Sequence, residues 1–372
     1  MNLTASCSLL VSLLLLWVPA ATSLPKAPRV VATATEEELP VVAAWSPDGQ
    51  RLAYGTEKKL RRKRPPLAAD EDKVFSYPGE VWVTGLKSKP KRILKYNFLR
   101  NRVGDFFSFT VERLAWSPDG TKLAVEVADE EKNTATFLLT ANGKKVKVGS
   151  RGTNYVPAYG AAWLGDNQSL GLLTEAVPPR LLHRVHLLRI TAGRNISLFR
   201  QRTFAAVAWL PQRQQAVLVE RDLEFARPPR LMLGDLKSGE LQLLDELSEG
   251  YLGGLRASPD ETKVSYFVGH KKLAVRGLAP DAPADYWPIP FGRYEWVGAT
   301  GTLLFLEPKA LGARTGWLTR YDPGQKTTER VLPDELIQDF WVAPTGDRVA
   351  VLTAGLKPTL KIYPLEAASS GP

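Results

Sequence analysis

Short apolar runs separated by turn residues extend along most of the chain. The first clear example is LPVVAAW, which is followed by SPDG and then by QRLAYGT. Pro47 fixes φ at the first central position of a turn, Asp48 suits the second, and Gly49 accepts left-handed backbone. The flanking runs carry Val and Tyr, which favour strands. The pattern predicts a tight β-hairpin with SPDG at its turn.

This hairpin pattern occurs seven times. With the position of Trp45 taken as the marker of each copy, the markers are Trp45, Trp116, Trp163, Trp209, Ala257, Trp296 and Val342, which are 71, 47, 46, 48, 39 and 46 residues apart. An apolar residue stands seven places after each marker, namely Leu52, Leu123, Leu170, Ala216, Val264, Leu303 and Val349. We assign a structural role in the repeat to Trp45, Pro47, Asp48, Gly49, Trp116, Pro118, Asp119, Gly120, Pro259, Asp260 and Pro344.

Most copies continue with two further apolar runs. After Trp116 these are TATFLLT and KKVKVGS, and after Trp209 they are RLMLGDL and ELQLLDE. Four short antiparallel strands in a repeat of about 40 to 50 residues are typical of a propeller blade. The predicted fold class is therefore all-β, a β-propeller of seven four-stranded blades in one domain over residues 24–372.

The two ends of the repeat region predict how the ring closes. The seventh copy has only three apolar runs, whereas RVVATAT (29–35) precedes the first copy. A strand formed by this N-terminal run would complete the last blade and remove two exposed sheet edges. Six blades are the alternative, because the copy at Ala257 is short and the first copy is long.

The repeated motif resembles that of a known family. Copies of WSPDG followed two residues later by an apolar strand are similar to the WD40-like repeats of TolB-type propellers, which also occur in prolyl-oligopeptidase-like peptidases. The resemblance covers roughly residues 29–366; it is strong at Trp45 and Trp116 and weak at Trp163, Trp209 and Trp296. The resemblance implies a periplasmic partner that is bound at the cell envelope. TolB itself has an α/β domain before its propeller, for which the stretch before residue 29 is too short.

The N-terminal segment has the pattern of a targeting sequence. LLVSLLLLWV is apolar, too short for a membrane span, and followed by the small residues of PAATS. We expect residues 1–23 to be a signal peptide, so that the protein is exported to the periplasm or secreted; an uncleaved segment would anchor it to the membrane instead. The single cysteine, Cys7, lies in this segment, so the mature chain would have no disulfide and no thiolate metal site.

A search for catalytic groups finds no motif. There is no G-x-S-x-G sequence, which disfavours the peptidase branch of the resemblance. His183 and His186 are three residues apart in an expected strand and would point to opposite faces, while His270 falls in an expected loop. We therefore predict a protein that is not an enzyme and binds no metal or cofactor. The alternative is an exported hydrolase or lyase that acts on sugars or peptides through carboxylates lining the channel.

One insertion is not required by the repeat. Residues 57–78 separate the second and third expected strands of the first copy and contain KKLRRKRPPLAADEDK. The chain as a whole carries 49 Lys and Arg against 39 Asp and Glu. A long loop with this basic run could dock onto an anionic partner. The alternative is a solvated loop whose basic and acidic parts neutralise each other.

Several arginines fall at the expected joints between blades. A connection from an outer strand to the next inner strand opens on the same face as a loop between second and third strands. The predicted partner-binding residues are accordingly Lys58, Lys59, Arg61, Arg62, Lys63, Arg64, Arg100, Arg102, Arg151, Arg200 and Arg202. The predicted function is a monomeric interaction platform for an envelope or extracellular protein or an anionic ligand. Membrane surface contact is a further option, and nucleic acid is disfavoured by export. A chance scatter of arginines is the alternative explanation.

Overall fold

The computed structural model describes residues 27–365 except for 37, 59, 62–74, 77–78, 96–98, 101–105, 108–109, 129–133, 150–154, 178–181, 200–201, 223, 225–226, 248–250 and 311–312. In this part of the chain the one helix is the 3-10 turn Gly298–Thr300, and all other regular structure is β-strand. Nowhere in it does the chain form an apolar helix long enough to cross a membrane. The predicted signal peptide lies outside the described residues.

The strands form antiparallel sheets that follow the order of the chain. The first sheet contains β2 (Glu38–Trp45), β3 (Arg51–Lys58), β6 (Gly79–Gly85) and β7 (Lys91–Leu94). The second contains β10 (Thr110–Trp116), β11 (Lys122–Ala128), β12 (Thr134–Thr140) and β13 (Tyr155–Val156). A further four-stranded sheet contains β22 (Tyr251–Ala257), β23 (Lys263–Val268), β24 (Leu273–Gly277) and β25 (Ala284–Trp287).

Two sheets have eight strands each. One contains β14 (Tyr159–Trp163), β15 (Ser169–Val177), β16 (Leu182–Arg189), β17 (Arg194–Ser197), β18 (Phe204–Leu210), β19 (Gln215–Glu220), β20 (Arg230–Asp235) and β21 (Leu241–Glu246). The other contains β26 (Tyr294–Val297), β27 (Thr302–Pro308), β28 (Gly316–Asp322), β29 (Thr327–Arg330), β30 (Ile337–Val342), β31 (Arg348–Thr353), β32 (Thr359–Pro364) and β1 (Arg29–Thr33). A single residue pair joins the halves of each, His183 with Phe204 and Gly316 with Ile337.

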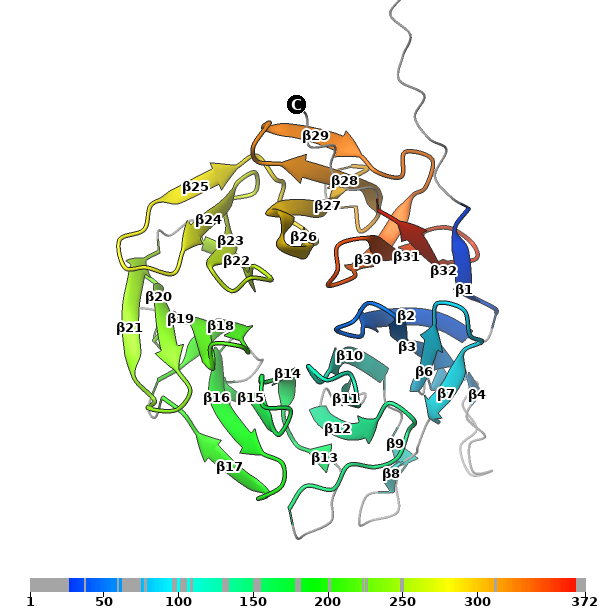
Figure 1. Ribbon diagram of the computed structural model, residues 1–372, viewed down its shortest axis with the longest axis horizontal. Helices are drawn as coiled ribbons and strands as arrows, with labels where there is room; N and C mark the ends of the chain where they lie inside the picture. The colour runs from blue at the N-terminus through cyan, green and yellow to red at the C-terminus, as the bar shows by residue number, and fades with distance from the viewer. Residues whose placement is uncertain are drawn as a thin grey trace, which may run out of the picture.

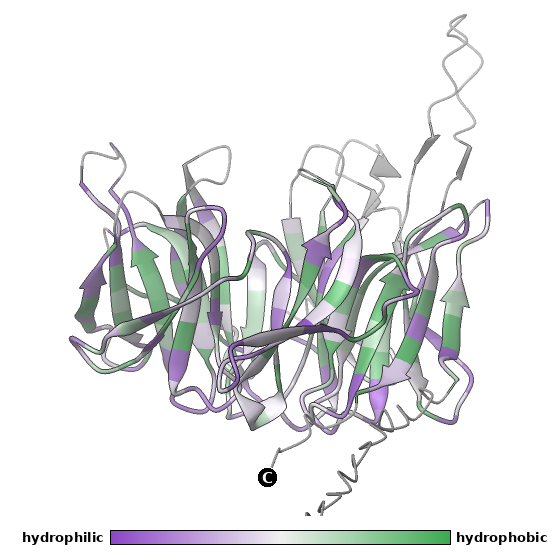
Figure 2. Ribbon diagram, turned by 90° about the horizontal axis from the view of Figure 1, so that it is seen from above, coloured by the Kyte–Doolittle hydropathy of each residue, from purple (hydrophilic) through white to green (hydrophobic). Residues whose placement is uncertain are grey.

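The sheets stand around a common centre (Figure 1). The strands nearest the centre are β2, β10, β14, β18, β22, β26 and β30, and each of them carries one of the seven markers. Seen edge-on, hydrophobic residues occupy the middle of the strands, and hydrophilic residues gather toward the two ends where the turns lie (Figure 2). Side chains from the first and last sheets share one hydrophobic cluster, which includes Trp45, Tyr54, Trp341 and Leu352.

The predicted hairpin spacing is confirmed in all seven copies. Every marker pairs with the apolar residue seven places later: Trp45 with Leu52, Trp116 with Leu123, Trp163 with Leu170, Trp209 with Ala216, Ala257 with Val264, Trp296 with Leu303 and Val342 with Val349. In the first turn Gly49 has a φ of 64°, and Asp48 accepts hydrogen bonds from Ser46 Oγ at 2.5 Å and from Gln50 N at 3.0 Å. Asp48 is therefore a turn residue, as predicted.

The marker tryptophans also connect neighbouring sheets. The indole N–H of Trp45 donates to Trp341 O at 2.9 Å, that of Trp116 to Ala44 O at 3.0 Å, and that of Trp163 to Ala115 O at 3.0 Å. In each of these bonds the acceptor is the residue directly before the marker of the preceding copy. The motif thus fastens adjacent inner strands to one another as well as forming a hairpin.

The outer strand of the second sheet differs from the prediction. We expected KKVKVGS to form it, and Lys144 and Val146 do bond to β12, through Thr140 N to Lys144 O at 2.7 Å and Val146 N to Leu138 O at 2.9 Å. The pairing is nevertheless an isolated bridge between Lys145 and Leu139, and the named outer strand is β13, which pairs with β12 farther along. Gly149 adopts a φ of 55° and donates its N–H to Ile190 O of the neighbouring sheet. The chain leaves β12 at this point because that left-handed residue turns it away.

Candidate functional site

The residue directly before each marker separates the seven copies into two groups. In the first four copies it is Ala44, Ala115, Ala162 and Ala208, whereas in the last three it is Arg256, Glu295 and Trp341. The exceptions lie on β22, β26 and β30, which follow one another around the centre in Figure 1. Charged groups therefore gather on one arc of the inner strands.

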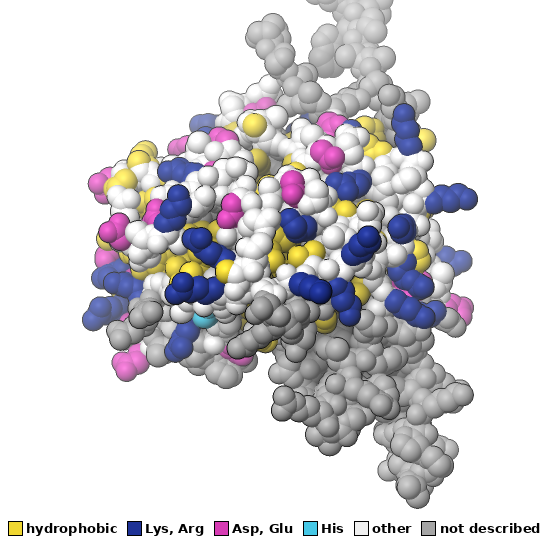
Figure 3. Space-filling view, turned by 60° about the horizontal axis from the view of Figure 1, so that its bottom comes forward, with side chains coloured by type: hydrophobic (Ala, Val, Ile, Leu, Met, Phe, Trp, Pro, Cys, Tyr) yellow, Lys and Arg dark blue, Asp and Glu magenta, His cyan; other side chains and the backbone are white. Residues whose placement is uncertain are grey.

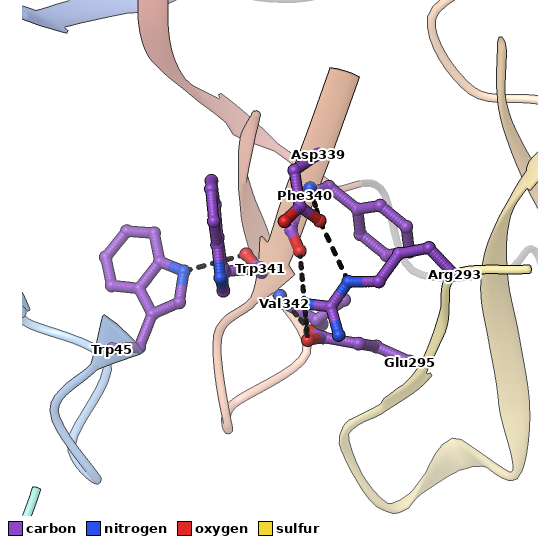
Figure 4. A network of polar contacts seen from close by, with 7 residues as sticks. All are labelled: Trp45, Arg293, Glu295, Asp339, Phe340, Trp341 and Val342. Carbon is purple, nitrogen blue, oxygen red and sulfur yellow. Dashed lines mark hydrogen bonds and ion pairs between the residues drawn. The ribbon is translucent and has the colours of Figure 1, made fainter. Parts of the chain in front are cut away.

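Arg293 links β26 to β30 through a set of polar contacts (Figure 4). Its Nε donates to Asp339 Oδ1 at 2.9 Å, and its Nη2 donates to Glu295 Oε1 at 2.5 Å and to Phe340 O at 2.8 Å. The second oxygen of Glu295 accepts the N–H of Val342 at 2.7 Å. Burial lowers the pKa of Arg293, but the charges of Glu295 and Asp339 outweigh this effect and raise it above its usual value. Both carboxylates are held in this network by hydrogen bonds.

Arg256 lies next to this network and has no such partners. Its guanidinium stands 5.4 Å from the ring centroid of Tyr294, yet within the described residues its side chain makes no hydrogen bond or ion pair. Burial lowers the pKa of Arg256, and the like charges of Arg293 and Arg113 add to this effect against the opposing charge of Glu295. The side chain nevertheless remains a cation at neutral pH, because arginine does not lose its proton in proteins.

The join between β22 and β26 also lacks the indole bond found elsewhere. Trp296 Nε1 is buried without a partner in the described part of the chain. The equivalent acceptor, Arg256 O, takes a hydrogen bond from Ser265 Oγ at 3.3 Å. Tyr294 connects the two strands in its place, since its hydroxyl donates to Gly254 O at 2.5 Å. Burial raises the pKa of Tyr294 to about 12, so the phenol stays protonated and keeps this bond.

A β-bulge on β10 brings a second unpaired arginine to the inner strands. The ladder between β10 and β11 skips Glu112, and both Glu112 and its neighbour Arg113 are exposed. A bulge breaks strict alternation, so sequence neighbours can become exposed together. Glu112 accepts a hydrogen bond from Thr110 Oγ1 at 3.0 Å. Arg113, like Arg256, makes no side-chain hydrogen bond or ion pair with any described residue.

The basic insertion starts from a short strand pair instead of being a loop throughout. After β3 ends at Lys58, β4 (Leu60–Arg61) pairs with β5 (Phe75–Ser76), with Arg61 opposite Phe75. A second pair, β8 (Leu99–Arg100) with β9 (Phe106–Phe107), lies between β7 and β10 and sets Arg100 opposite Phe106. Because the strands alternate in direction, both pairs leave their sheets at the end opposite the SPDG turns.

The remaining predicted partner-binding residues are only partly described. Lys59, Arg62, Lys63, Arg64, Arg102, Arg151 and Arg200 lie outside the described residues. Arg202 is ion-paired with Glu220, so part of its charge is already compensated. The view in Figure 3 shows Lys and Arg side chains in a belt across the described surface, with fewer Asp and Glu among them.

The histidines take structural positions. His183 and His186 use opposite faces of β16, as predicted: His183 Nδ1 is 2.7 Å from Tyr159 Oη, and His186 Nε2 is 2.8 Å from Thr174 Oγ1. Burial and the charge of Arg184 lower the pKa of His186. No three His, Cys, Asp or Glu side chains in the described ranges stand close enough together to hold a metal ion.

Comparisons with known proteins place this arrangement at the level of fold. No family model matches the chain, and no curated protein does either. The β-propeller domain of Myceliophteria thermophila Cps50 (Swd1) is 12% identical with a TM-score of 0.57, over 91% of this chain and 100% of that one. The β-propeller domain of the Trilobed protease from Pyrococcus furiosus, whose topology is an open velcro, is 13% identical with a TM-score of 0.58, over 89% and 94%.

An oligogalacturonate lyase in complex with manganese is also similar, at 13% identity and a TM-score of 0.57, over 87% of this chain and 88% of that one. The similar structures thus include both an enzyme and a domain that is not named as part of one. At these identities the likeness shows the fold alone, which is a β-propeller of the all-β class. The function has to be argued from the residues of this chain.

Proposed function

We propose that this chain is an exported, non-enzymatic β-propeller that binds an anionic partner through the end of the ring bearing residues 57–78. The observation that carries the proposal is the pair of short strand ladders, β4–β5 and β8–β9, at the same end of two neighbouring sheets. Each ladder places an arginine, Arg61 or Arg100, in paired backbone where the repeat needs no structure. A partner that binds both segments would explain why they are built in this way.

We further propose seven blades in a closed, TolB-type ring. Dividing each eight-stranded sheet at its single joining pair leaves four strands around every marker. Strand β1 pairs with β32 through Arg29–Ile362 to Thr33–Thr359, and the chain then enters the first sheet. The Arg29 side chain supports closure, since it donates to Gly85 O, Thr84 Oγ1 and Ser88 O of the first sheet at 2.5, 3.0 and 2.6 Å.

The test compares two variants that lose equal charge from opposite ends of the sheets. One carries glutamine at Lys58, Lys59, Arg61, Arg62, Lys63 and Arg64. The control carries glutamine at the exposed residues Lys87, Lys89, Lys91, Lys144, Lys145 and Lys147, which lie in or beside the turns at the SPDG end. Binding to poly-L-glutamate, a stand-in for an acidic protein, is measured against salt concentration, with anionic lipid vesicles as the second arm.

The first variant should bind poly-L-glutamate at least about tenfold more weakly and with a shallower salt dependence, because each basic residue at such a surface contributes up to about 1 kcal/mol. The control should retain most of the binding. Equal losses in the two variants would show that total charge matters and not this end of the ring. Binding to vesicles but not to poly-L-glutamate would show that the surface binds lipid headgroups, and it would exclude an acidic protein as the partner.

A further inference from the structure

The inner strands contain two cations without acceptors. Arg256 on β22 and Arg113 on β10 make no side-chain hydrogen bond or ion pair within the described residues. The carboxylates near these two arginines in the fold or the sequence do have donors: Glu295 and Asp339 accept from Arg293, and Glu112, next to Arg113 on β10, accepts from Thr110. The inner strands therefore lack an acceptor for Arg256. A charged acceptor stabilises a guanidinium that is removed from bulk water more than it stabilises an exposed one.

A β-bulge lies directly before Arg256 on β22. The ladder between β22 and β23 pairs Gly253 with Phe267 and then Arg256 with Ser265, so two consecutive residues, Gly254 and Leu255, have no partner across it. Bulges of this kind commonly lie beside binding sites. A Cβ built on Gly253, three residues before Arg256, would meet no atom within 4 Å, whereas one on Gly254 would lie 2.7 Å from the Phe267 ring, so the open side of this bulge is at Gly253.

Tyr294 gives Arg256 a fixed support. The cation lies against the aromatic ring, which attracts it through the negative face of the π system. The ring is itself held by the bond from its hydroxyl to Gly254 O, and Tyr294 is 1% exposed. A guanidinium held beside an aromatic ring can still present N–H groups to an acceptor. Pairs of these groups match the two oxygens of a carboxylate or phosphate.

We propose that Arg256 binds a single oxyanion group, a carboxylate or a phosphate, near the centre of the ring. This site is separate from the basic insertion, because Arg256 directly precedes its marker and so lies toward the SPDG end of β22. Its failure would leave the proposed function untouched, and the reverse also holds. The bound anion compensates the charge of Arg256, and it also stabilises the fold by mass action.

The experiment titrates inorganic phosphate and succinate separately into the full chain and into variants, with calorimetry and thermal unfolding as readouts. Arg256→Gln should weaken binding by at least about tenfold, and Arg256→Lys should retain a part, since charge-assisted bonds are the strong ones. Arg330→Gln is the matched control, because Arg330 on the outer strand β29 is already ion-paired with Glu307 of β27 at 2.9 Å. It should bind like the unmodified protein.

The ligand-free variants separate this role from a merely structural one. If Arg256 serves binding, Arg256→Gln should unfold at the same or a higher temperature without ligand, because a repelled cation is removed, while the shift caused by the anion disappears. Preference for phosphate or for succinate identifies the chemical source of the oxyanion. Absence of binding to both anions, or binding that survives in Arg256→Gln, overturns the proposal. Should Arg256→Gln fail to fold, Arg256→Lys decides it, and unchanged affinity of that variant for both anions overturns the proposal.

Discussion

Replacing Trp45 by phenylalanine tests whether the marker tryptophan fastens neighbouring sheets. The chain contains its own control at Trp296, which occupies the same position of the repeat. Both side chains are 7% exposed, so trimming either indole to a phenyl ring removes similar buried volume. They differ in one respect: the Trp45 N–H donates to Trp341 O at 2.9 Å, whereas the Trp296 N–H is buried without an acceptor.

The difference between the two variants isolates the bond between sheets. Trp45→Phe leaves the buried carbonyl of Trp341 without its indole donor, and an orphaned buried group of this kind costs about 1–3 kcal/mol. Trp296→Phe removes a donor that was already unsatisfied, so its hydrogen-bond contribution is zero or favourable. The loss of ring volume is common to both and cancels. We expect Trp45→Phe to lower the free energy of unfolding by about 1–3 kcal/mol more than Trp296→Phe does.

The measurement is urea unfolding followed by far-ultraviolet circular dichroism, with the dependence on urea compared among all three proteins. An unchanged slope assigns the effect to stability and not to a change in the unfolded state. Trp163→Phe, which loses a bond to Ala115 O, should group with Trp45→Phe. Equal losses at Trp45 and Trp296, or a larger loss at Trp296, would refute the view that the indole N–H joins the sheets.

Two further predictions concern the interior and the turns. Gly171→Ala should lower the free energy of unfolding by about 1–3 kcal/mol, because the added Cβ would lie 2.5 Å from the Trp209 ring. The control Gly277→Ala should be nearly neutral, because its Cβ meets nothing closer than 3.5 Å, and equal urea midpoints for the two variants would contradict this prediction. Hydrogen bonds, first that from Ser46, lower the pKa of Asp48 in the folded protein. The ionised carboxylate therefore stabilises the fold above its unfolded pKa of about 3.9, and this effect is lost as the pH falls through the folded value. The difference in unfolding free energy between Asp48→Asn and the unmodified protein should accordingly shrink below about pH 4, and a difference independent of pH would exclude this cause.

The hairpins could be predicted from sequence because their information is local. Turn chemistry and a fixed spacing lie within eight residues, so even the copy at Ala257, which has no tryptophan, pairs with Val264 as its spacing requires. The outer strand after Trp116 could not be predicted in the same way. KKVKVGS has the alternation of a strand, but the left-handed Gly149 and its bond to Ile190 depend on a neighbouring sheet.

Contacts between residues that are far apart in the chain could not be predicted from this one sequence. Trp45 and its acceptor Trp341 are 296 residues apart. Arg202 was predicted to face a partner but is ion-paired with Glu220, whereas Arg256 was not singled out and has no acceptor in the described residues. The composition gives the number of arginines, but only the folded structure shows which of them are ion-paired with a carboxylate.

One signal in the sequence does point to the central cluster once the repeats are aligned on their markers. The first four copies have alanine before the marker, and the carbonyls of Ala44 and Ala115 accept the indole N–H of the next copy, as that of Trp341 also does. Arg256 and Glu295 depart from this pattern in adjacent copies, and there the indole bond between sheets is replaced by Tyr294 and by the Arg293 network. The two departures are adjacent in the ring, and each is accompanied by other polar bonds between neighbouring inner strands, so this part of the ring is joined by contacts that the rest of the repeat does not use.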